Sequence, residues 1–258
     1  ASVVGVVVSG VRGSAGSVRI QQSDEVVMRV RLEDEAARQM PLRWRGIALD
    51  RFDNRTWRRS RMSFRDVFER GERELIQVDF ARGQNDLIVQ TFYLEPMETP
   101  VLFALSRPIG VQGNFPILFR DSYGSISFPR VGERTSYRVI SDTSLPDVEA
   151  LRSDRSAYPY EYRDYLQLPR DLDERIYSLA EEVVADADNR YDAAELTERY
   201  LKTRFGYTLD QKAGGDKPLA DIHFNVREGH CEYFATAKAI MLRTQGIATR
   251  VVNVYQTG

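Results

Sequence analysis

The hydrophobic pattern changes its period part-way along the chain, and this change limits the fold more than any other feature. Residues 17–141 contain short apolar runs separated by Gly, Pro, Asn and Asp, and in one run Met28 and Val30 alternate with arginines. Alternation with a period of two is typical of half-buried strands. Seven or more such runs with turn signals between them predict an antiparallel β-sandwich.

A polar, tyrosine-rich stretch separates these strands from a region with helical spacing. We therefore expect an α+β chain of 258 residues, which is long enough for two cores. Its expected parts are a linker or remnant of a preceding segment over 1–16, a β-sandwich domain over 17–141, a linker over 142–168 that packs against a surface, and an α+β domain over 169–258. The plainer alternative for the small apolar residues near the start is a β-strand.

Helices are expected in the last third of the chain. One apolar face repeats at helical spacing after Pro169, through Leu172, Ile176, Leu179 and Val183. Asp192 and Glu195 together predict a capping box for the next helix. A further helix is predicted over CEYFATAKAIMLRTQG, from Cys231 to Gly246.

Short strands flank these helices, and one segment of the β region is ambiguous. Runs at 206–210 and 248–256 predict strands, and Asp53 with Asn54 predicts a turn between two short runs. Residues 63–74 fit either a loop or one short helix.

The charge balance and the absence of certain motifs exclude several classes of function. The chain has 36 basic and 38 acidic residues with no dominant basic block, so we expect no nucleic-acid partner. No run reaches the roughly 18 apolar residues of a membrane span. Asp50, Asp53 and Asp86 lack the spacing of a calcium loop and are read as turn residues, so we expect no metal and no cofactor.

Cys231 is the only cysteine and the strongest candidate for chemistry. A single cysteine at the start of a helix is often an inert buried residue. However, the free N–H groups and positive dipole end of a first turn stabilise a thiolate, which predicts a pKa below about 8.5. Gly229 permits a sharp entry that would present the sulfur, and the backbone N–H of Cys231 would point at an oxyanion formed during acyl transfer.

Neither histidine is a convincing base for this thiol. His230 adjoins Cys231 in sequence, and neighbouring side chains seldom face each other productively. His223 lies eight positions earlier and is read as a loop or packing residue, because a base must reach hydrogen-bond distance.

The segment REGHCEYFATAKAIMLRTQGIATRVVNVY (227–255) resembles the nucleophile segment of the transglutaminase-like superfamily. The N-terminal segments GSVRIQQSDEVVMRVRLED and LRWRGIALDRFDNRTW resemble the extracytoplasmic β domain of bacterial membrane-anchored members. This resemblance implies a papain-like core in which Cys231 is the nucleophile of a Cys-His-Asp triad. The family's His and Asp lie on strands downstream of the Cys helix, beyond Gly258. We therefore expect residues 1–258 alone to be inactive.

The resemblance implies a protein-glutamine gamma-glutamyltransferase-like reaction. The thiolate would attack a Gln side chain of a protein or peptide, and the acyl group would pass to an amine or to water. The chain would be the periplasmic part of an inner-membrane protein, anchored by transmembrane segments outside it. Two alternatives remain open: a cysteine peptidase or amidase of the same fold, and a non-catalytic binding module for a cell-envelope partner.

Overall fold

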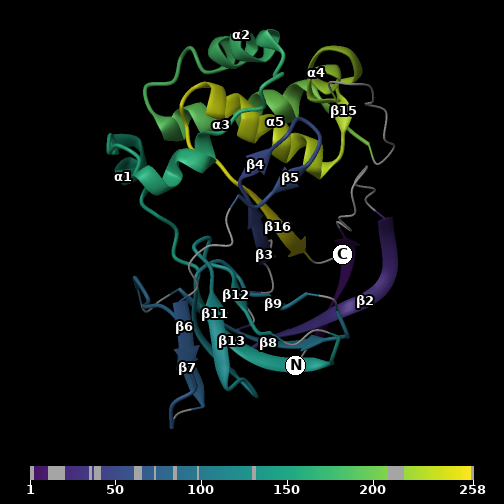
Figure 1. Ribbon diagram of the computed structural model, residues 1–258, viewed down its shortest axis with the longest axis vertical. Helices are drawn as coiled ribbons and strands as arrows, with labels where there is room; N and C mark the ends of the chain where they lie inside the picture. Colours follow the sequence, from purple (N-terminus) through teal and green to yellow (C-terminus); the bar gives the residue numbers. More distant parts are fainter. Residues whose placement is uncertain are drawn as a thin grey trace.

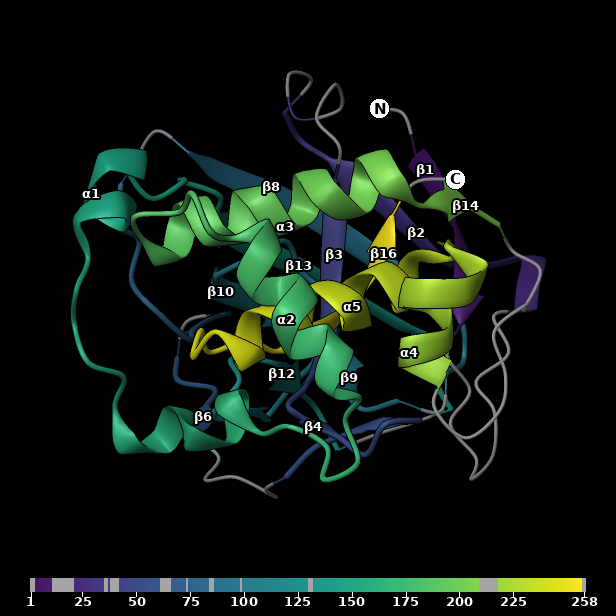
Figure 2. The ribbon, with the colours of Figure 1, turned by 90° about the horizontal axis from the view of Figure 1, so that it is seen from above.

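The structure is a computed structural model with a helical layer on one side and β-sheets on the other (Figure 1). It describes residues 3–10, 21–34, 37, 42–60, 66–72, 74–83, 86–97, 99–129, 132–208 and 218–256. Seen from above, the helices lie over the sheets (Figure 2). The chain therefore has the α+β class that the sequence predicts.

Two antiparallel sheets form the β layer. The six-stranded sheet has the order β1-β2-β8-β13-β10-β7, with bounds Val3–Gly10, Gln21–Leu32, Leu87–Leu94, Thr135–Asp142, Pro108–Gly113 and Leu75–Gln77. The four-stranded sheet has the order β6-β11-β12-β9, with bounds Asp66–Glu69, Ile117–Arg120, Ile126–Ser127 and Val101–Leu102.

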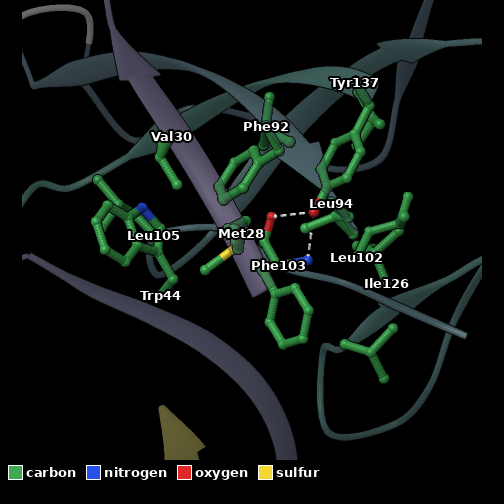
Figure 3. Packing of buried hydrophobic residues seen from close by; sticks show 14 of the residues in the cluster. Met28, Val30, Trp44, Phe92, Leu94, Leu102, Phe103, Leu105, Ile126 and Tyr137 are labelled. Carbon is green, nitrogen blue, oxygen red and sulfur yellow. Dashed lines mark hydrogen bonds between the residues drawn. The ribbon is translucent and has the colours of Figure 1, made fainter. Parts of the chain in front are cut away.

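The two sheets share one apolar core (Figure 3). Met28 and Phe92 from the large sheet and Ile126 from the small one are all almost fully buried. Tyr137 packs on Phe92 with ring centroids 4.9 Å apart. Its hydroxyl donates to the carbonyl of Phe103 at 3.0 Å and accepts from the N–H of the same residue at 2.7 Å, so the buried phenol is satisfied.

Residues 66–69 form a strand, not the loop or short helix expected for this region. β6 pairs with β11 in register from Asp66↔Arg120 to Glu69↔Ile117. The Arg120 guanidinium also donates to the Asp66 carboxylate, with an Nη2–Oδ2 distance of 2.7 Å. These residues form a strand because they pair with a strand about fifty residues away, and a local sequence pattern does not indicate such a distant partner.

The helical layer contains α1 (Val148–Ser153), α2 (Glu174–Val183), α3 (Arg190–Arg204), α4 (Pro218–Asp221) and α5 (Cys231–Thr244), with a 3₁₀ turn η2 (Tyr160–Leu166) and a π-helical turn η3 (Ile222–Val226). Short strands β14 (Gly206–Tyr207) and β15 (Glu228–Gly229) pair in parallel. The described part of the chain contains no helix long and apolar enough to cross a membrane.

The predicted apolar face of α2 is confirmed, but the predicted cap of α3 is wrong. Ile176 is fully buried in a second core with the other members of that face. α3 begins three residues before the expected start, because Asn189 is its N-cap and accepts a hydrogen bond from the N–H of Asp192 at 2.9 Å. The Asn189 amide also donates to the Asp192 carboxylate at 2.6 Å, so Asp192 is part of the first turn.

Strands from the N-terminal half enter the helical layer. β3 (Arg43–Leu49) pairs with β16 (Val251–Gln256), so the last described strand is bound to a strand some two hundred residues earlier. The hairpin of β4 (Arg51–Phe52) and β5 (Trp57–Arg58) follows, with the predicted turn between its strands. Phe52 is buried in the second core, among side chains of α2 and α5.

The polar stretch 142–168 lies against the helical layer. The Arg152 guanidinium of α1 is 3.0 Å from the Asp192 carboxylate of α3. The N–H of Thr249 donates to the carbonyl of Tyr165 at 2.9 Å. The stretch is therefore attached to α3 through Arg152 and to the segment between α5 and β16 through Tyr165.

Candidate functional site

Cys231 is the first residue of α5, and its side chain is a free, exposed thiol. The helix begins where the sequence predicts and ends at Thr244, two residues before the predicted end; Gln245 is its C-cap, and Gly246 follows with a φ of 71°, which is left-handed and suits glycine. Buried residues such as Ala237, Ile240 and Met241 anchor α5 in the second core. The thiol therefore lies at the end of a firmly packed helix.

The entry into α5 depends on Gly229. A Cβ atom at this position would lie 3.0 Å from Cδ2 of Tyr233, so a larger side chain would have to displace that ring. The carbonyl of Gly229 also accepts from the N–H of Thr208 at 3.0 Å, which attaches β15 to the chain after β14. The close approach expected from sequence is thus present.

His230 is the N-cap of α5. Its Nδ1 accepts a hydrogen bond from the N–H of Glu232 at 3.3 Å, and its ring lies 4.4 Å from that of Tyr233. Because Nδ1 is an acceptor, the imidazole is neutral in this arrangement. Burial lowers the pKa of His230, which agrees with a neutral cap.

The thiol is less acidic than its helical position predicts. The surrounding protein partly desolvates the sulfur and raises the pKa of Cys231; the Glu232 carboxylate raises it further, while the backbone N–H groups lower it. The expectation of a lowered pKa is therefore wrong for this chain. Helix position alone does not activate a thiol that lacks a cationic partner.

His223 is buried among aromatic rings. It lies in η3, is fully buried, and its ring meets those of Phe205 and Phe224 at centroid distances of 5.7 and 6.0 Å. Neither ring nitrogen has a hydrogen-bond partner within the described residues. Desolvation lowers the pKa of His223 to about 4, so the ring is neutral at pH 7. These contacts are those of a packing residue.

The β4–β5 hairpin supports the nucleophile helix from the N-terminal half of the chain. Trp57 Nε1 donates to the hydroxyl of Thr236 on α5 at 2.8 Å. The Trp57 ring also stacks on Phe52, with centroids 5.0 Å apart, and lies below the guanidinium of Arg243 at 5.0 Å. The helix that carries Cys231 is thus held by residues some 180 positions earlier.

Arg243, on α5, hydrogen-bonds to three other segments of the chain. This residue was not identified from the sequence. Its guanidinium donates to the carbonyls of Asp50, Gln167 and Thr249 at 2.7, 2.6 and 2.6 Å. It is 98% buried (2% exposed), and desolvation lowers its pKa to about 10 while the Asp50 carboxylate opposes the shift. The sequence signal that could have identified Arg243 is an arginine among the apolar residues of a predicted helix.

Two of the three aspartates considered for calcium, Asp50 and Asp53, hydrogen-bond to other parts of the protein. The buried Asp50 carboxylate accepts from the N–H of Ser60 at 2.7 Å and from the Tyr123 hydroxyl at 2.8 Å. Asp53 holds its turn by accepting from the N–H of Thr56 at 2.7 Å. No cluster of three His, Cys, Asp or Glu residues able to hold a metal occurs within the described ranges.

Each half of the chain matches a known protein family. Residues 14–147 match the family described as TgpA N-terminal domain, and residues 177–258 match the transglutaminase-like superfamily. A Pseudomonas aeruginosa protein named protein-glutamine gamma-glutamyltransferase is 33% identical over 241 residues, or 92% of this chain and 33% of the relative. The chain thus spans about a third of the length of that relative.

One further relative and two solved structures give the same assignment. Protein YebA of Bacillus subtilis, named as uncharacterized, is 30% identical over 119 residues, or 44% of this chain and 16% of YebA. The crystal structure of the periplasmic domain of TgpA from Pseudomonas aeruginosa superposes with a TM-score of 0.71 at 28% identity, covering 92% of this chain and 76% of that one. Its ethylmercury-bound form gives a TM-score of 0.69, covering 92% and 78%. The chain therefore belongs to the transglutaminase-like superfamily, with a TgpA N-terminal domain before the transglutaminase-like core.

Proposed function

We propose that Cys231 is the nucleophile of a protein-glutamine gamma-glutamyltransferase-like reaction. The thiolate attacks the side-chain amide carbon of a substrate glutamine, and the nitrogen leaves as ammonia after gaining a proton from the base. A primary amine or water then attacks the thioester and restores the thiol. The backbone N–H of Cys231 faces the oxyanion that forms in both steps.

One observation carries this proposal: the chain's single cysteine is exposed at the first residue of α5, inside the segment that matches the superfamily. An inert cysteine would be expected in the core. The relative from Pseudomonas aeruginosa carries the name of this activity.

The base and its orienting carboxylate are proposed to be a His and an Asp on strands that follow β16 in the longer protein. The two histidines of this chain have other contacts, since His230 caps α5 and His223 is buried among aromatic rings. A nearby imidazolium would counter the desolvation that raises the pKa of Cys231. The activity is therefore assigned to the longer protein.

The proposed location is the periplasm, as part of a membrane-anchored protein. The solved relative is described as a periplasmic domain, and its alignment covers 92% of this chain. The glutamine substrate would then be a side chain of an extracytoplasmic protein or peptide.

The test compares the natural full-length protein with residues 1–258, using incorporation of a fluorescent primary amine into a glutamine-containing protein. The full-length protein should label the substrate, and Cys231→Ala and Cys231→Ser should abolish labelling. Residues 1–258 should give no labelling above background, because a triad without its base loses nearly all of its rate. Ammonia release, measured in parallel, reports hydrolysis where no amine is accepted.

His223→Leu in the full-length protein is the matched control and should retain activity. If residues 1–258 turn over substrate and His223→Leu stops the reaction, the base has been assigned wrongly. If the folded full-length protein neither labels the substrate nor releases ammonia, the binding-module alternative is favoured.

A further inference from the structure

A cleft of about 570 Å³ lies between the β4–β5 hairpin and residues 167–171, the segment that leads into α2. Figure 2 shows β4 beside this segment, on the side of the molecule away from α3. The volume lies within the range of small-ligand and peptide sites, about 300–1,000 Å³. Nothing in the proposed acyl transfer uses this cleft.

The cleft is built on fixed backbone. The side chain of Gln167 accepts from the N–H of Phe52 at 2.8 Å and donates to its carbonyl at 2.9 Å, so it joins the two walls as a strand partner would. The buried Asn54 amide donates to the carboxylate of Asp171 at 3.3 Å. Because both walls are held before any ligand arrives, binding would require little ordering.

Four arginines and two aspartates line the cleft, and the arginines are not all neutralised. Arg58 pairs with Asp53 at 2.8 Å, and Arg59 pairs with Asp121. Arg51 on one wall and Arg170 on the other are exposed, and neither guanidinium has a partner among the described residues. Two cationic groups, unpaired within the described part of the chain, therefore line the cleft from opposite walls.

The register of the hairpin adds a second, independent observation. Arg51 and Arg58 are direct cross-strand partners in β4–β5. Like charges at opposed positions destabilise an antiparallel pair. Asp53 forms an ion pair with Arg58, and within the described residues no carboxylate pairs with Arg51. A local arrangement that costs stability at the edge of a cleft is typical of a binding site, where an anion between the two strands would relieve the repulsion.

We propose that this cleft binds an acidic segment of a partner protein, with carboxylates on Arg51 and Arg170. The planar fork of arginine matches a carboxylate with two parallel hydrogen bonds. The exposed carboxylates of Asp53 and Asp171 in the same cleft repel a uniformly charged polyanion, whereas a peptide with spaced acidic residues avoids them. The partly buried Leu168 and the backbone of the walls offer contacts to the uncharged residues between them.

The test uses fluorescence anisotropy at low salt with a rhodamine-labelled peptide of alternating Glu and Gly. The unmodified protein should bind it saturably and more weakly as salt is added. Arg51→Gln and Arg170→Gln should each weaken binding about tenfold, and the double variant should abolish it. Arg51→Lys should bind with intermediate strength, because it keeps the charge and loses the fork.

Arg70→Gln is the matched control, since Arg70 is also exposed at a strand end but lies outside the cleft, and it should bind like the unmodified protein. Thermal unfolding should show that all variants are folded, and Arg51→Gln should be at least as stable because it removes the cross-strand repulsion.

Three results would overturn the proposal. The first is no binding of the acidic peptide, and the second is equal binding of the same peptide with Gln in place of Glu. The third is binding that survives the double Arg51/Arg170 replacement. A short oligodeoxythymidine that binds more tightly than the peptide, and loses binding in the same variants, would reassign the cleft to polyanions. None of these measurements depends on the thiol, so failure here and failure of the proposed reaction are distinguishable.

Discussion

The position of Cys231 could be predicted from sequence, but its acidity could not. The helix start follows from local signals, namely Gly229 and the apolar run after the cysteine. The pKa of the thiol depends on how far the folded protein desolvates the sulfur, which the local sequence pattern does not reveal. Desolvation and the Glu232 carboxylate outweigh the first-turn N–H groups.

The raised pKa of Cys231 gives a prediction for the chain as described. Alkylation of residues 1–258 by iodoacetamide, followed against pH, should show a midpoint above the ordinary thiol range. Glu232→Gln should lower that midpoint, because it removes a negative charge beside the thiolate. A midpoint well below the ordinary thiol value would show that the helix terminus activates the sulfur unaided.

His223 predicts a dependence of stability on pH. Its folded pKa is about 4 against an ordinary value of 6.5, so between these values the unfolded chain binds a proton that the folded chain does not. Stability should therefore fall as pH drops through this window, by about 2 kcal/mol from this residue between pH 7 and pH 5.

Urea unfolding at the two pH values measures this contribution. His223→Leu should remove it and leave the smaller contribution of His230, whose pKa is also lowered by burial. An unchanged difference between pH 7 and pH 5 in the variant would show that His223 does not titrate as described.

At the scale of elements, the hydrophobic period and the turn residues predicted most strands and helices, but they did not predict which strands pair with each other. The alternation around Met28 and the helical face through Ile176 were both confirmed. β6 was missed because its partner β11 lies far along the chain, and the α3 start was displaced because Asn189 competes with Asp192 for the cap. The contacts of Trp57 with α5 lie beyond any local window.

The Trp57–Thr236 hydrogen bond predicts a measurable coupling between the hairpin and the nucleophile helix. Thr236→Val leaves the Trp57 N–H unpaired and should cost about 1–3 kcal/mol of unfolding free energy. Trp57→Phe removes the donor, and the double variant should cost about 1 kcal/mol less than the sum of the single changes. Urea unfolding of the four proteins completes the cycle.

Thr203→Val is the matched control for this cycle. Thr203 is exposed on α3 and its hydroxyl donates only to backbone carbonyls of its own helix, so the change should cost a few tenths of a kcal/mol. Strictly additive single changes at Trp57 and Thr236 would show that the bond does not couple the two elements.

At the scale of the molecule, the residues before the 142–168 stretch and those after it are joined by strand pairing, a hydrogen bond and a shared core. β3 pairs with β16, Arg243 bonds the carbonyl of Asp50, and Phe52 is buried in the helical core. The proposed division at residues 142–168 remains a prediction about accessibility. Residues 154–159 lie between α1 and η2 and are mostly exposed, which makes them the expected place for a first cut.

This interlocking predicts that a cut chain stays together. A sequence-specific protease site inserted between Asp154 and Arg155 should be cleaved in the folded protein, because both residues are exposed. The two fragments should then co-elute on gel filtration and separate only in denaturant, since strand pairing and a shared core join them across the cut. Adding Arg243→Met should weaken the association, because it removes the hydrogen bond from Arg243 to the Asp50 carbonyl, which joins the two fragments. Arg204→Met, at an exposed position on α3, should leave it unchanged. Fragments that separate in native buffer would mean that the halves fold and behave as independent domains, despite the shared strands.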